Sequence, residues 1–265
     1  MDTIVNTGGR ECLAETPGTI PAPTTDPKMS FARQVSRRWV LRGAIAGSTG
    51  AVLAGAGVLG AEASPANAGV SASTLTEFFS ILATGEALFV TFYSQAIAHH
   101  IRLGLFGSAL TALSAILAEE QLHLNFALSQ GGTLATTHFS MPDGQVTFNS
   151  RAAFLQTQQL AEELTNGALL AWIKDTSSMG LTRLAELGGQ LMQVEGGHRV
   201  VGRVILGADP WDNWAFGPIA LNHFTDVPAA VTAAGFLSPK PGNDFEFHPV
   251  SPIFPGVINT TPGSP

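Results

Sequence analysis

The chain has 265 residues, a formal net charge of −7 and a single cysteine, Cys12. From Gly69 onward seven basic residues stand against 15 acidic ones, about −8 in all, which excludes the basic stripe that is typical of nucleic-acid-binding proteins. Cys12 precedes Gly69, so disulfide and thiolate chemistry are excluded from the 197 residues that remain, which suffice for one domain with a full core.

The first 68 residues are predicted to be a disordered leader that ends in an export signal. Ser36-Arg37-Arg38 is a twin-arginine sequence, a glycine- and alanine-rich apolar run follows at 43–60, and Ala66-Asn67-Ala68 is a small-residue cleavage pattern. We expect recognition by the twin-arginine export machinery, cleavage before Gly69 and a periplasmic or extracellular location. An uncleaved membrane anchor is the alternative. A start at Met29 would give the signal a more usual length.

Four helices are predicted between residues 69 and 206, because apolar residues recur there at helical spacing. They span about 75–103, 108–130, 151–174 and 181–206. The connection between the second and third helices is longer than a hairpin needs, which favours a crossover that runs along the helices. The last part, 207–265, holds ten of the 16 prolines, so we expect an extended tail with one short helix at 226–236.

Two Glu-x-x-His motifs are the main candidates for metal ligands in this sequence. They are Glu120 with His123 on the second predicted helix and Glu195 with His198 on the fourth. Residues three apart on an α-helix lie on nearly the same side, so each motif directs a carboxylate and an imidazole to one spot. Glu86 lies within the apolar stripe of the first predicted helix, where a carboxylate without a partner is costly to bury. Divalent cations would neutralise these groups. A buried network of Glu and His without metal is the alternative.

The spacing of these motifs resembles a known family. The segments Gly85-Glu86-(x)6-Tyr93, Glu120-x-x-His123, Phe154-Leu155-(x)6-Glu162 and Glu195-x-x-His198 look like the ferritin-like domain, and more narrowly its exported bacterial branch related to plant desiccation-related proteins. The resemblance covers about 75–205. It implies an all-α, ferritin-like four-helix bundle with a dinuclear metal site. The ligands that it implies are Glu86, Glu120, His123, Glu162, Glu195 and His198.

Two residues of this pattern have alternative interpretations. Glu162 is implied by the resemblance, but it lies roughly 110° around the helix from the most apolar line of the third predicted helix. Gln158 or Thr165 could replace it or hold a water. Tyr93 is either a hydrogen-bond donor to the ligands or a residue of the core.

Carboxylate-rich N,O coordination predicts iron or manganese rather than zinc or copper. The expected chemistry is redox with O2 or peroxide, of ferroxidase, peroxidase or catalase type. Gly196 and Gly197 have no side chains and lie between Glu195 and His198. Their small size favours either entry of a small oxidant or close helix packing. A non-catalytic stress or desiccation-related envelope protein is the alternative function. The sequence is compatible with a homo-oligomer.

Overall fold

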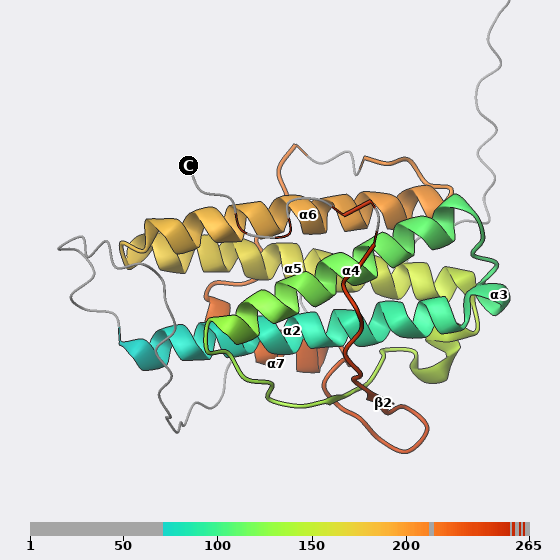
Figure 1. Ribbon diagram of the computed structural model, residues 1–265, viewed down its shortest axis with the longest axis horizontal. Helices are drawn as coiled ribbons and strands as arrows, with labels where there is room; N and C mark the ends of the chain where they lie inside the picture. Colours follow the sequence, from blue (N-terminus) through green and yellow to red (C-terminus); the bar gives the residue numbers. More distant parts are fainter. Residues whose placement is uncertain (1–70, 212–214, 255, 258–259, 261, 263–265) are drawn as a thin grey trace, which may run out of the picture. The chain divides into compact units, whose positions relative to one another are not determined.

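The computed structural model describes residues 71–211, 215–254, 256–257, 260 and 262 of the protein, and these residues are mostly helical (Figure 1). This confirms the prediction of an all-α fold at the level of its secondary structure. The strands in the described part have two residues each, β1 at His138–Phe139 and β2 at Phe245–Glu246, and they pair antiparallel. The predicted leader at 1–68 lies outside the described residues.

Four long helices make up most of the described chain. They are α2 Ala72–Ala98, α4 Ser108–Ser129, α5 Arg151–Ser178 and α6 Thr182–Leu206. α2 packs along α4, α5 packs along α6, and the two pairs share one apolar core. The connection from α4 to α5 runs back along the helices, so both helices begin at the same end (Figure 1). It contains β1 and the 3-10 helix η2, Gly144–Phe148.

Hydroxyl caps and one glycine define several helix ends. The Ser71 hydroxyl accepts the backbone N–H of Thr74 at 3.2 Å, and the Ser150 hydroxyl accepts that of Ala153 at 3.4 Å. Each cap satisfies a donor that the first turn of a helix leaves without a partner. α6 ends at Gly207, where a φ of 79° requires the left-handed conformation that glycine adopts most easily.

Two predicted helices differ from those observed. The first is divided, because α2 stops at Ala98 and His99 leads into the single turn α3, His100–Leu103. The third continues beyond Lys174, and its last turns hold the C-terminal part of the chain in place. Asp175 accepts the backbone N–H of Phe224 at 2.8 Å and contacts His223 Nδ1 at 3.2 Å.

The residues after α6 wrap around the long helices. They form the 3-10 helix η3, Phe224–Asp226, and the short helix α7, Val227–Ala233, which lies within the predicted span 226–236. The ring of Phe224 packs edge-on against the fully buried Trp172, with a centroid distance of 4.9 Å. After β2 the chain crosses α4 (Figure 1), where the backbone N–H of Val250 donates to Gln121 Oε1 at 2.8 Å.

One helix in the described part, Thr74–Ala98, is long and apolar enough to cross a membrane by length and composition alone. Most of it is buried within the protein, and side chains such as Phe79 and Tyr93 are almost fully enclosed. The core helix of a globular domain has the same composition, so this helix by itself is weak evidence for a membrane span.

Candidate metal centre

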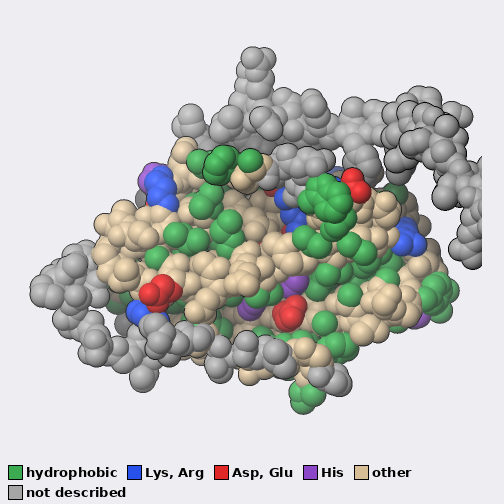
Figure 2. Space-filling model, turned by 90° about the horizontal axis from the view of Figure 1, so that it is seen from above, with side chains coloured by type: hydrophobic (Ala, Val, Ile, Leu, Met, Phe, Trp, Pro, Cys, Tyr) green, Lys and Arg blue, Asp and Glu red, His purple; other side chains and the backbone are tan. Residues whose placement is uncertain are grey.

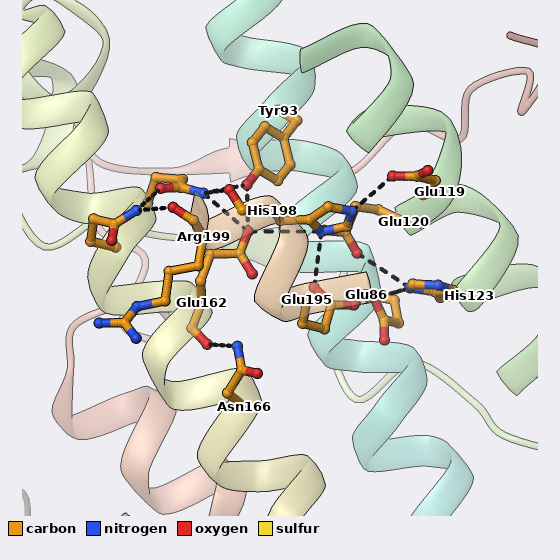
Figure 3. Close-up of polar contacts among 12 residues, drawn as sticks. Glu86, Tyr93, Glu119, Glu120, His123, Glu162, Asn166, Glu195, His198 and Arg199 are labelled. Atoms are coloured by element: carbon orange, nitrogen blue, oxygen red, sulfur yellow. Dashed lines mark hydrogen bonds and ion pairs between the residues drawn. The ribbon is translucent and has the colours of Figure 1, made fainter. Parts of the chain in front are cut away.

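The six side chains proposed as ligands lie together between the four long helices (Figure 3). They come from all four: Glu86 from α2, Glu120 and His123 from α4, Glu162 from α5, and Glu195 and His198 from α6. Five of them are at most 3% exposed, whereas the side chain of His123 is 13% exposed. The structure thus brings the whole predicted set together, and metal binding by it stays a prediction.

Two carboxylates face both imidazoles. Glu195 places Oε1 3.1 Å from His123 Nδ1 and Oε2 3.0 Å from His198 Nδ1. Glu120 places Oε2 3.7 Å from His123 Nδ1 and Oε1 3.1 Å from His198 Nδ1. Glu86 lies on the His123 side, with Oε2 3.8 Å from Nδ1, and Glu162 lies on the His198 side, with Oε1 4.0 Å from Nδ1.

The structure places Glu162, rather than Gln158 or Thr165, in the cluster. Tyr93 donates its hydroxyl hydrogen to Glu162 Oε1, so Tyr93 is both fully buried and a donor to a predicted ligand. Gln158 supports this pair from α5, because its Nε2 donates to Tyr93 Oη at 3.1 Å and to the backbone oxygen of His198 at 2.9 Å. Thr165 instead borders an apolar cavity that Glu86 also lines.

One contact in this cluster was not predicted. Glu119 Oε2 lies 2.8 Å from His198 Nε2, the nitrogen on the far side of the ring from the other carboxylates. Helical spacing places Glu119 away from the apolar stripe of its helix, and its side chain is 31% exposed. The only feature of the sequence that points to Glu119 is its position next to Glu120. That position identifies Glu119 as a contact of His198 only once α6 is known to lie beside α4.

Burial and mutual attraction set the charge of this cluster. Burial alone would lower the pKa of His123 and of His198, but the surrounding carboxylates outweigh it and hold both pKa values well above the usual value. Burial raises the pKa of Glu86 and of Glu162 well above the usual range. Burial also opposes ionisation of Glu195, but the charge of His198 outweighs it and holds the Glu195 pKa well below the usual range. Without a metal ion, the cluster therefore keeps protons on several of these groups.

The donor set fits a metal ion. Several buried carboxylate oxygens accept no hydrogen bond from the described residues, namely Glu86 Oε2, Glu120 Oε1 and Oε2, Glu162 Oε2 and Glu195 Oε1. Buried acceptors of this kind are usually satisfied, and a cation is one way to satisfy them. The donor atoms form two groups, each with its atoms within 4.8 Å of one another, and Glu120 and Glu195 belong to both. These buried groups can hold a metal ion.

Comparisons with protein-family models, with curated proteins and with solved structures found no match. The resemblance to the ferritin-like domain therefore depends on the spacing of the motifs in this sequence.

His123 borders a pocket of about 130 Å³ between α4 and α6, together with Glu119 and the C-terminal residues Val257 and Thr260. Neither this pocket nor the apolar one includes Gly196 or Gly197 in its wall. A Cβ atom at Gly197 would meet nothing within 4 Å, and one at Gly196 would meet only Asn166 Oδ1 at 3.9 Å. Close packing therefore does not explain these glycines.

Figure 2 shows one face of the described surface, where acidic and histidine side chains reach the surface among hydrophobic ones. The Lys and Arg side chains on this face stand apart from one another instead of forming a patch.

Proposed function

We propose that the part of the chain from Gly69 is a ferritin-like four-helix bundle that binds a dinuclear iron or manganese centre for redox chemistry with O2 or peroxide. Four long helices with a long connection between the second and third, and an inward Glu or Glu-x-x-His set on each, support this proposal. The chemistry of the donors favours iron or manganese, because carboxylate oxygens are hard ligands and the described cluster contains no thiolate.

The observation that carries the proposal is the double role of Glu120 and Glu195. Each turns one oxygen toward His123 and the other toward His198, at 3.0–3.7 Å. A single ion would use only part of this set, whereas two ions would share the two central carboxylates and take one imidazole each. Glu86 would complete the position next to His123, and Glu162 the position next to His198.

Two bound iron or manganese ions would supply one-electron redox chemistry, in which the reduced ions are oxidised as O2 or peroxide is reduced. The protein's own residues prepare the place where this happens. The buried carboxylates offset the positive charge of the cations in a site from which water is largely excluded. The Tyr93 hydroxyl holds a hydrogen next to Glu162, and Gln158 fixes the orientation of that hydroxyl.

Oxidant consumption tests this function directly. The metal-free protein is loaded with Fe(II) or Mn(II) under inert gas, and the loss of O2 or hydrogen peroxide is followed. We expect faster loss per metal ion than in a solution of the same metal without protein. Glu195→Ala, which lacks a central carboxylate, serves as the variant with an incomplete centre. Its rate of oxidant loss per metal ion is expected to equal that of the metal without protein.

The alternative is a non-catalytic stress or desiccation-related envelope protein. It predicts that the wild-type protein binds metal but consumes neither O2 nor peroxide faster than free metal does. That result would replace the redox function and leave the metal centre as a structural element.

Export by the twin-arginine route belongs to the same proposal, since this route carries folded proteins and would allow the metal to be loaded before export. The supporting residues, Arg37, Arg38 and Ala66-Asn67-Ala68, lie outside the described part. We expect mass spectrometry of the extracytoplasmic protein to show Gly69 as the first residue. The double variant Arg37→Lys, Arg38→Lys should remain inside the cell. A full-length, membrane-retained product would contradict cleavage.

A further inference from the structure

An apolar cavity of about 50 Å³ lies between α2 and α5 and adjoins the metal centre. Part of its wall comes from the residues after α6, including Phe224 and Val231. The side chains in this wall are apolar except for those of Glu86 and Thr165. Because Glu86 also belongs to the group around His123, the cavity borders the metal centre at one of its proposed ligands.

Gly85 forms part of the wall of this cavity. It lies in the middle of α2, where glycine destabilises a helix relative to alanine. Elsewhere in the chain a helical glycine permits close packing, since a Cβ at Gly188 would lie 2.5 Å from Trp172 Cδ1. A Cβ at Gly85 would meet nothing within 4 Å, so no packing contact requires glycine there. A larger side chain at this position would extend into open space at the cavity wall.

The two pockets beside the metal centre differ in chemistry. The wall of the pocket at His123 combines apolar side chains with four polar or charged ones, Glu119, His123, Gln190 and Thr260. The wall of the cavity at Glu86 has only two polar side chains, those of Glu86 and Thr165. Both pockets adjoin the group around His123, one at Glu86 and the other at His123 itself.

The size and lining of the cavity define its ligand class. A single water molecule needs roughly 10–15 Å³ of comparable space and several polar partners, so this cavity is large enough for a few heavy atoms but poor in partners for water. Apolar protein cavities bind apolar gases such as xenon. We propose that the cavity between α2 and α5 is a binding site for a small apolar molecule and that O2 is its ligand beside Glu86. The assignment of O2 rests on the proposed function, whereas binding of an apolar gas does not.

Xenon is the probe for the cavity itself. Metal-free full-length protein is crystallised, pressurised with xenon and compared with the variants Gly85→Leu and Gly189→Leu. Gly189 is a matched control, because it also lies within a long helix with nothing within 4 Å of a Cβ, and it borders neither pocket. We expect xenon between α2 and α5 in the wild type and in Gly189→Leu, and a clear loss of its occupancy in Gly85→Leu. Absence of xenon from this place in the wild type would overturn the proposal.

The metal-loaded proteins test O2 as the ligand. Gly85→Leu should keep its metal content but show a severalfold lower ratio of O2 to peroxide consumption, and Gly189→Leu should keep the wild-type ratio. If Gly85→Leu does not fold, Ala168→Leu fills the same cavity from α5. An unchanged ratio in a folded, filled variant would overturn the assignment of O2. A wild type that binds xenon and consumes peroxide but no O2 would overturn the assignment of O2 alone. Xenon binding by a wild type that consumes neither O2 nor peroxide would overturn the proposed redox function, and the apolar site would stand.

Discussion

Glu195→Ala and Glu120→Ala are each expected to reduce the metal content from two ions per chain to fewer than one. Each carboxylate faces both imidazoles, so its removal takes an oxygen from both metal positions at once. Glu86→Ala and Glu162→Ala remove a ligand from one position only, and about one ion per chain should remain. Elemental analysis after anaerobic loading and desalting measures these values.

Glu163→Ala is the matched control for this series. Glu163 follows the proposed ligand Glu162 on α5, but its side chain is 41% exposed and contacts Arg199 at 3.7 Å, away from the cluster. The Glu163→Ala variant should retain two metal ions per chain. Helix content measured by circular dichroism separates loss of a ligand from loss of the fold. Equal metal content in the central and peripheral variants would contradict the shared role of Glu120 and Glu195.

Glu119→Ala is expected to weaken one of the two metal positions about 10–100-fold, which is the usual effect of removing a carboxylate that holds a ligating histidine. Glu119 contacts His198 Nε2 at 2.8 Å, while Nδ1 of the same ring faces the cluster. The carboxylate therefore fixes the orientation of the ring and leaves Nδ1 as the nitrogen that can bind a metal ion. Glu119→Gln keeps an oxygen that accepts the Nε2 hydrogen, so it should recover part of the affinity.

A stepwise binding isotherm distinguishes this positioning role from a general effect on stability. Only the position next to His198 should weaken, and the melting temperature of the metal-free protein should stay close to that of Glu163→Ala. If Glu119→Ala weakens both positions equally, or neither, Glu119 does not act through His198.

The long helices, and the inward faces of the first, second and fourth of them, could be predicted from the sequence because both depend on local spacing. The two Glu-x-x-His motifs are of this kind, and so is Glu86 within its apolar stripe. Glu162 was uncertain because α5 is buried on more than one side, by α6, by α2 and by the residues after α6. A helix of this type has no single apolar stripe from which the direction of a side chain can be derived.

The remaining features depend on contacts between distant parts of the chain. Glu119 meets His198 across 79 residues, and Tyr93 meets Glu162 across 69. The pairing of β1 with β2 and the apolar cavity beside Glu86 require knowledge of where the C-terminal part lies on the long helices. No periodicity within one segment contains that information.

Calorimetric titration of the metal-free, full-length protein with Mn(II) at neutral pH tests the central claim most directly. We expect two Mn(II) ions to bind per chain with a net release of protons, which is measured by repeating the titration in buffers of different ionisation enthalpy. Protons must leave because the pKa values of His123 and His198 are raised, so binding should also strengthen as the pH rises. Binding of fewer than two ions, or binding that persists when Glu120 and Glu195 are both replaced by alanine, would contradict a dinuclear centre at this place.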